Sequence, residues 1–355
     1  MHTIPGAGSE PAPGPTPSEQ TGHVLLTQRP AAGRGSWWRS DWAAFALRRA
    51  GGLVLSVALL VLVTFLIVPL LPGDPAVSML GTKATPEAIA ELRERMGLND
   101  PIWVQFGHYL TNIAHGQFGD SFRYGIPVSE IIATKLPYTA GLAFGSIVLV
   151  LLVSIPLGML IGVLTRAGRR GWLATAFGAV AGFFASFPTA VAGTLLVVVF
   201  AIWLGALPAG GAETASSAVL PIIGLSLGPI FAVARVVRQE TYTVLQQDFM
   251  RTAKGKRLRA ARRYLQHALP NLMASTLTLT GLVLAGLIGG TVVIETVFSY
   301  PGLGLEVVQS IIYKDYPTIQ GIILVIGGLA ILINLLVDVV LGIIDPRTLG
   351  GQNHG

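Results

Sequence analysis

Long runs of uncharged, apolar residues are the feature that most constrains how this chain can fold. A transmembrane helix needs about 20 apolar residues to cross roughly 30 Å of hydrocarbon. The sequence contains five plain runs of that length and one longer run, and each is too apolar for the surface of a water-soluble domain. We therefore expect an all-α integral membrane protein. The plain runs cover residues 51–73, 136–165, 214–234, 264–294 and 316–337, and the longer one covers 171–212.

Composition agrees with this prediction and excludes several classes of site. Charged residues make up only 12% of the chain and apolar ones 52%, whereas soluble domains carry about 25% charge. The absence of cysteine excludes disulfides, thiolate metal sites and cysteine nucleophiles. Despite the net charge of +6, the basic stretches lack interleaved base-reading residues, so we expect no nucleic-acid binding.

The placement of basic residues predicts the number and direction of the spans. If residues 171–212 form one span, the chain has six. Three basic segments then share one side: the N-terminal arginines, the loop containing Arg166, Arg169 and Arg170, and residues 235–263. Two spans in that run would move the last segment across and violate the positive-inside rule. We therefore expect six spans in a plasma membrane protein, with both termini in the cytoplasm and with tryptophans such as Trp172 at the interfaces.

The chain divides into a membrane domain and short flanking segments. Residues 1–42 begin with a stretch rich in Pro, Gly and Ser that cannot bury much apolar surface, so we expect a disordered cytoplasmic tail. The predicted permease domain covers residues 43–347 and is followed by a short cytoplasmic tail, 348–355. Within it, residues 74–135 are expected to form a small extracytoplasmic segment.

One soluble helix is predicted inside the extracytoplasmic segment. Thr85 is a suitable N-cap, Pro86 suits the first turn, and Gly97 suits the C-terminal end. Glu91 and Arg95 are spaced to form an ion pair across one turn. The apolar face of this helix is formed by Ile89, Leu92 and Met96.

The most informative stretch is the predicted cytoplasmic loop at residues 244–270. Small residues stand among basic ones there, which predicts a short helix outside the membrane whose surface another protein can approach closely. The alternative is a basic loop that only follows the positive-inside rule and binds anionic lipid. The loop residues that we single out are Asp248, Arg251, Thr252, Ala253, Lys254, Gly255, Lys256, Arg257 and His267.

This loop resembles the cytoplasmic loop of ATP-binding-cassette (ABC) importer permeases. Asp248, Ala253 and the stretch from His267 to Asn271 match the dipeptide/oligopeptide (peptide/nickel) branch, and the chain resembles its first permease subunit. Arg257 stands where that branch usually has glycine, and Gly255 where it often has alanine. These departures leave the conformation of the turn open.

Further short motifs extend the resemblance over residues 45–347, in the order and spacing of the family. Several motifs in register are more specific than any single one. They are Leu71-Pro72-Gly73-Asp74-Pro75, Gly97-Leu98 with Pro101, GQFGDS at 116–121, Ser186 with Pro188, ETVFSYPGLG at 295–304, Asp315-Tyr316-Pro317 and Asp345-Pro346-Arg347.

The resemblance implies a type I ABC importer permease that couples transport to ATP hydrolysis without catalysing it. The expected partners are a second permease subunit, two ATPase subunits, an extracytoplasmic substrate-binding protein and membrane lipid. The chain contains no GxxxxGK[ST] phosphate-binding loop, so ATP and Mg²⁺ are expected on the ATPase subunits. We expect no catalytic residue, metal or cofactor in this chain, since His267 has no ligand partner at helical spacing.

Three residues are candidates for the pathway or its outer vestibule. Pro188, with Ser186 beside it, is expected to break the third span next to the pathway, or to form an ordinary packing kink. Glu295 precedes a Pro-Gly turn, where it is either a structural elbow or part of a docking surface for the binding protein.

Other classes of protein remain as alternatives. A secondary carrier predicts inverted repeats and midplane charges, and an intramembrane enzyme predicts facing catalytic groups; neither pattern is evident. Within the importer class, the alternatives to di- and oligopeptides are nickel complexes and glutathione.

Overall fold

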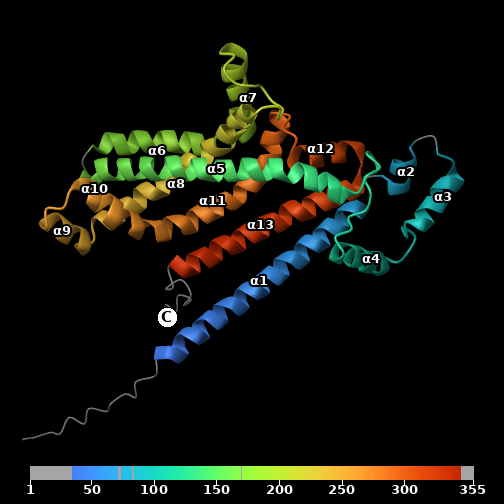
Figure 1. Ribbon diagram of the computed structural model, residues 1–355, viewed down its shortest axis with the longest axis horizontal. Coiled ribbons are helices and arrows are strands. Elements are labelled where there is room, and N and C mark those ends of the chain that lie inside the picture. Colours follow the sequence, from blue (N-terminus) through green and yellow to red (C-terminus); the bar gives the residue numbers. More distant parts are fainter. Residues whose placement is uncertain (1–33, 71–72, 82–83, 169, 345–355) are drawn as a thin grey trace, which may run out of the picture.

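The computed structural model describes residues 34–70, 73–81, 84–168 and 170–344. The regular secondary-structure elements of these residues are all helices (Figure 1). The elements, in chain order, are α1 (Arg34–Leu70), α2 (Pro75–Leu80), α3 (Pro86–Arg95), α4 (Ile102–Ala114), α5 (Val128–Leu164), η1 (Arg166–Gly168), α6 (Gly171–Ser186), α7 (Thr189–Leu196), η2 (Val197–Trp203), η3 (Ala215–Ala218), α8 (Val219–Leu245), α9 (Asp248–Gly255), α10 (Ala260–Arg262), η4 (Arg263–Ala268), α11 (Leu269–Val297), α12 (Leu303–Tyr313) and α13 (Tyr316–Ile344).

Long apolar helices match the predicted spans closely. Within the described residues, four helices are long and apolar enough to cross a membrane, and a fifth span results if α6 and the α7–η2 unit are counted together. The remaining predicted span corresponds to α11, a helix of 29 residues, some of whose side chains lie outside the described part of the chain. The all-helical class is confirmed, while the total of six spans stays a prediction.

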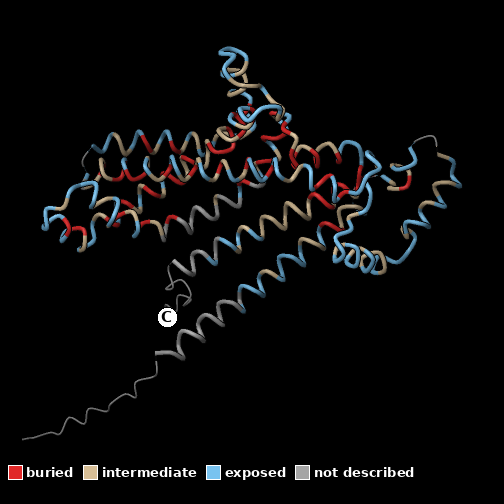
Figure 2. The backbone as a smooth tube through the Cα atoms, viewed as in Figure 1, coloured by how far each residue is buried: buried red, intermediate tan, exposed pale blue. Residues whose placement is uncertain are grey.

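The centre of the bundle is the pair α5 and α8, which approach closely through glycines. A Cβ atom built on Gly158 would lie 2.5 Å from the Ala234 carbonyl oxygen, and one on Gly162 would lie 2.8 Å from Cβ of Thr241. Small residues allow such close backbone packing between helices in a membrane. Buried residues accordingly concentrate along these two helices, whereas α1 is exposed along most of its described length (Figure 2).

The third predicted span is sharply broken. α6 ends at Ser186 and α7 begins at Thr189, and the two are bent by 94° at this break. α7 therefore projects from the bundle instead of continuing along α6 (Figure 1). The cause is local, because Pro188 lacks an N–H group and disfavours helical conformation in the residue before it. The third span is thus divided into two helices at Pro188, where the sequence predicts a break or a packing kink.

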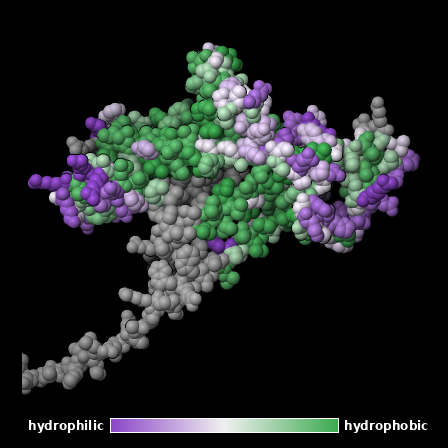
Figure 3. All heavy atoms as spheres, in the orientation of Figure 1, coloured by the Kyte–Doolittle hydropathy of each residue, from purple (hydrophilic) through white to green (hydrophobic). Residues whose placement is uncertain are grey.

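Polar segments lie at the two ends of the bundle. α9 and α10 are at one end, together with the η1 turn, and α2, α3 and α4 are at the other (Figure 1). Hydrophilic surface gathers at these ends, with hydrophobic surface between them (Figure 3). α1 packs against α13, where Gln320 Nε2 donates to the Thr64 carbonyl oxygen at 3.2 Å. This arrangement fits a bundle whose middle lies in hydrocarbon.

The predicted soluble helix is confirmed as α3. The Ala88 N–H donates to Thr85 Oγ1 at 3.4 Å, Arg95 pairs with Glu91, and Gly97 has a φ of +64°. By contrast, residues 34–42, expected within a disordered tail, belong to α1. Residues 36–50 contain neither Gly nor Pro, so a helix that has formed in the span can extend toward the N-terminus. Residues 1–33 and 345–355 lie outside the described residues.

The glycine contacts between α5 and α8 generate a stability prediction. Gly158→Leu is expected to lower the stability of the detergent-solubilised chain by about 1–3 kcal/mol, because the added atoms would overlap α8. Gly141→Leu is the matched control in the same helix, since a Cβ there meets nothing within 4 Å. Thermal unfolding of both variants measures the difference; equal midpoints would contradict close packing at Gly158.

Candidate functional site

α9 is a short amphipathic helix at the polar end next to α10 (Figure 1). Its Asp248 lies in the first turn and Lys254 in the last, which suits the helix dipole. Arg251 Nη1 lies 3.2 Å from Asp248 Oδ1, with both side chains mostly exposed. Thr252 Oγ1 donates to the Asp248 carbonyl oxygen at 3.1 Å. The charged face of α9 is therefore free to meet a partner.

The opposite face of α9 is anchored on the bundle. Met250 is 5% exposed and belongs to a core cluster with Val244 of α8 and Leu272 of α11. Ala253 is only 6% exposed, so it is not on the outer surface where the sequence predicts it, because it shares the buried face with Met250. Gly255 is exposed, and a Cβ built there meets nothing within 4 Å. Of the two small residues, Gly255 alone remains accessible to a partner.

The turn after α9 contains Arg257, at the position where the family that the sequence resembles usually has glycine. Arg257 has a φ of +55°, a left-handed conformation that favours glycine. The Arg257 N–H donates to the Lys254 carbonyl oxygen at 3.0 Å. The preceding N–H, that of Lys256, donates to the Thr252 carbonyl oxygen at 2.9 Å. Arg257 thus adopts the backbone conformation that glycine permits, at a cost of about 1–2 kcal/mol.

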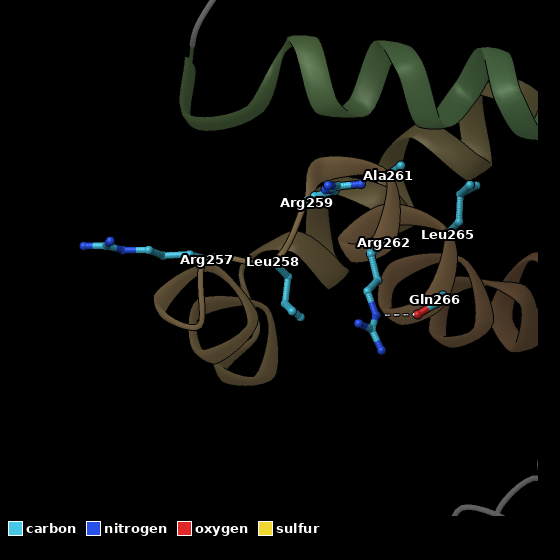
Figure 4. A pocket seen from close by; sticks show the side chains of 7 residues that line it. All are labelled: Arg257, Leu258, Arg259, Ala261, Arg262, Leu265 and Gln266. Carbon is cyan, nitrogen blue, oxygen red and sulfur yellow. Dashed lines mark hydrogen bonds between the residues drawn. The ribbon is translucent and has the colours of Figure 1, made fainter.

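An open pocket of about 630 Å³ follows this turn. Its side chains come from the turn and from the α10–η4 segment, and Arg262 Nε donates to Gln266 Oε1 at 2.8 Å (Figure 4). His267 lies in η4, and its carbonyl oxygen accepts from Asn271 Nδ2 at 2.7 Å. The pocket is lined by Arg257, Leu258, Arg259, Ala261, Arg262, Leu265 and Gln266.

The pathway candidates lie in two different environments. Ser186 and Pro188 are exposed at the α6–α7 break, where Phe184 stacks on Phe231 of α8 with ring centroids 4.7 Å apart. Beyond the break, Gly193 of α7 lies against Phe298, next to the end of α11. The break is therefore packed against the bundle on one side and open on the other.

Glu295 is fully buried, and its contacts are those of a structural elbow. Thr139 Oγ1 of α5 donates to Glu295 Oε1 at 2.7 Å, and the Leu305 N–H donates to Oε2 at 3.0 Å. The Leu303 N–H donates in turn to Thr139 Oγ1 at 2.8 Å. A Cβ at Gly302 would lie 2.4 Å from the carboxylate. Of the two interpretations for Glu295, the geometry within this chain favours the elbow.

Asp315 forms a second buried carboxylate site at the same end. It accepts from Ser121 Oγ, from the Phe122 N–H at 3.0 Å and from Thr318 Oγ1 at 2.8 Å. Ser121 ends the GQFGDS motif and Asp315 begins the Asp-Tyr-Pro motif, so two motifs that are far apart in sequence meet here. Thr139, which bonds Glu295, was not singled out from the sequence, because a threonine inside an apolar run carries no signal of its partner.

A third carboxylate at this end, on α12, forms an ion pair with α5. Lys135 Nζ lies 3.0 Å from Glu306 Oε2, with side-chain exposures of 26% and 4%. Burial raises the pKa of the neighbouring Tyr124 hydroxyl, and the Glu306 charge raises it further. Together, the Glu295, Asp315 and Glu306 carboxylates join α5, α11, α12 and the start of α13.

Two family models match the chain. The model described as "Binding-protein-dependent transport system inner membrane component" matches residues 154–350, and the model for the N-terminal part of such membrane components matches residues 43–143.

Relatives that match nearly their whole length carry transport names. A putative peptide transport system permease protein of Brucella abortus (strain 2308) is 37% identical, over 86% of this chain and 98% of that protein. A probable peptide ABC transporter permease of Sinorhizobium fredii is 37% identical, over 85% and 98%. A glutathione transport system permease of Salmonella choleraesuis is also 37% identical, over 85% and 97%.

Among solved structures, an inward-facing MetNI methionine ABC transporter matches with a TM-score of 0.50 and 18% identity, over 61% of this chain and 96% of that chain. At 18% identity, this match supports a similarity of fold only, and the fold is that of ABC importer permeases.

The left-handed turn at Arg257 predicts a stabilising substitution. Arg257→Gly is expected to stabilise the turn by about 1 kcal/mol, because glycine tolerates positive φ. Amide exchange at Leu258, whose N–H donates to the Ala253 carbonyl oxygen, should slow by about fivefold. Lys256→Gly is the control, since Lys256 has a φ of −70° and should gain nothing. Faster exchange in Arg257→Gly would contradict the assigned conformation.

The elbow at Glu295 predicts a specific loss of stability. Thr139→Val removes a donor to the buried carboxylate and the acceptor of the Leu303 N–H, and should cost about 1–3 kcal/mol. Thr139→Ser keeps the hydroxyl and should retain most of the stability. Thermal unfolding of the purified chain distinguishes them, and equal losses in both variants would argue against these hydrogen bonds.

Proposed function

Because this chain belongs to the family of binding-protein-dependent transport system inner membrane components, we propose that it forms one half of the translocation pathway of an ATP-driven importer for di- and oligopeptides. It is a multi-pass inner membrane protein and a permease subunit, not an enzyme, since its family and its relatives are transport components. The proposed permease domain covers residues 43–347.

The observation that carries the proposed coupling role is the two-sided character of α9. Met250 and Ala253 attach it to the bundle, while Asp248, Arg251 and Gly255 leave its other face exposed. A helix held in this way transmits a force applied to its outer face. We propose that an ATPase subunit applies this force, with residues 244–270 acting as the coupling loop.

The proposed orientation of the chain across the membrane rests on the positions of its basic residues. The η1 turn with Arg166 and the α9–η4 segment lie at the same end of the bundle. Under the positive-inside rule this end is cytoplasmic, so residues 74–135 are extracytoplasmic and both termini are cytoplasmic.

The proposed assembly contains a second permease subunit, two ATPase subunits and an extracytoplasmic binding protein. ATP and Mg²⁺ bind on the ATPase subunits; closure of these subunits opens the permease outward, and hydrolysis resets it. Moving a two-state permease from 1:99 to 99:1 requires roughly 5.5 kcal/mol of differential interaction. A helix anchored in the core is better suited to transmit this energy than a loose loop.

Peptides are the favoured substrate because relatives from two genera carry that name at 37% identity. Glutathione, itself a small peptide, is the second candidate, since a Salmonella permease of that name matches equally well. We place the pathway along the open side of the α6–α7 break at Ser186 and Pro188, whereas Glu295 acts as an elbow that supports the outer end.

The coupling role predicts an uncoupled variant. Gly255→Glu adds a charged side chain to the exposed face of α9, where a Cβ has no neighbour within the chain, so folding and membrane insertion should be preserved. Peptide uptake and substrate-stimulated ATPase activity of the assembled importer should fall by about tenfold or more, which corresponds to about 1.4 kcal/mol of lost contact.

Gly107→Glu on α4 is the matched control, because a Cβ there also meets nothing within 4 Å and the site lies at the other end of the bundle. Its ATPase coupling should remain near that of the wild type. Wild-type uptake and ATPase activity in Gly255→Glu would refute the role of α9.

A further inference from the structure

Two arginines from separate elements contact Tyr264 at the end of the bundle that carries α9, and a third lies on α8 beside the end of α5. Arg166 Nη1 donates to the Tyr264 hydroxyl at 3.4 Å. The guanidinium of Arg263 lies over the Tyr264 ring, 5.5 Å from its centroid. Arg238 lies on α8 one turn from Arg166, since its carbonyl oxygen would be 3.0 Å from a Cβ atom built on Gly162 of α5. All three arginines are half-buried.

The positive charge of this cluster is not neutralised within the described chain. The ion pairs among the described residues involve Arg93, Arg95, Lys135 and Arg251, and none involves the cluster. The Nε–H groups of Arg238 and Arg263 are buried and have no hydrogen-bond partner in the part of the chain that the structure describes. Buried polar groups are normally satisfied, so the cluster calls for an anion from outside the chain.

The depth of the cluster favours a lipid over a protein partner. Arg166 begins η1, two residues after the end of α5 at Leu164. Arg238 lies on α8 before its end at Leu245, about 10 Å inside that end at about 1.5 Å per residue. Trp172, at the start of α6 and 72% exposed, marks the level of a membrane interface. The cluster thus lies at headgroup depth, whereas α9 carries the surface available to a soluble subunit.

We propose that Arg166, Arg238 and Arg263 form a binding site for the phosphate of an anionic phospholipid in the inner leaflet. Guanidinium groups bind phosphate oxygens in bidentate geometry and tolerate partial burial better than ammonium groups. Basic pockets between transmembrane helices on the cytoplasmic side are suited to such headgroups. The bound lipid would join α5, α8 and η4, the elements next to α9, and this inference does not depend on the substrate.

The test uses the full chain in neutral detergent and measures its thermal unfolding midpoint. Short-chain phosphatidylglycerol should raise the midpoint in a saturable manner, because a ligand that binds the folded state stabilises it. Phosphatidylcholine and inorganic phosphate at the same concentrations should have little effect. An equal response to phosphatidylcholine would overturn a charge-specific site, and an equal response to inorganic phosphate would overturn the lipid assignment. These comparisons require only the wild-type chain.

A matched set of variants locates the site. In the double variant Arg166→Gln, Arg263→Gln, the half-saturating concentration of phosphatidylglycerol should rise by about fivefold for each arginine removed. Arg262→Gln is the control, because Arg262 is exposed and bonded to Gln266 (Figure 4). An equal loss in the control would refute the site. A double variant that keeps its lipid response but no longer binds the ATPase subunit would assign the cluster to that subunit instead.

Discussion

In hydrocarbon, backbone N–H and C=O groups have no water to bind, and this constraint governs the structure. Long helices satisfy it along the spans, so the places where a helix ends or breaks need special groups. At the end of α11, the buried Glu295 carboxylate accepts the Leu305 N–H, and Thr139 accepts that of Leu303. The glycines that face this carboxylate leave room for it. The turn between α11 and α12 is thus completed by side chains where water would otherwise be needed.

The two ends of the bundle differ in how their charges are compensated. At the proposed outer end, Glu306 pairs with Lys135 and Asp315 accepts three hydrogen bonds, so buried charge is matched within the chain. At the opposite end, Arg238 and Arg263 keep buried donors without partners among the described residues. Buried charge is costly unless it is paired. We therefore infer that the buried charges at the proposed outer end are compensated within this chain. Those at the proposed inner end are compensated by lipid and protein partners.

The connection between these ends passes through the α5–α8 pair. Close contact at Gly158 and Gly162 makes the two helices one packed unit, and Met250 attaches α9 to the same core as α8 and α11. Densely packed interiors transmit displacement because they have little free volume. A movement of α9 is consequently expected to shift α8 and α11 together, which is the mechanical requirement for the proposed coupling.

The sequence alone determined the features that depend on local chemistry. The apolar runs predict the long helices, the Thr85 cap and Gly97 delimit α3, and the proline at 188 predicts the break, since each signal acts over a few residues. Only the tertiary structure decided that the break is bent by 94°, that Ala253 faces inward, and that Glu295 is bonded to Thr139, 156 residues away. These outcomes depend on which helices pack together. A helical period of 3.6 residues identifies the residues that share one face of a helix, but not the helix that packs against that face.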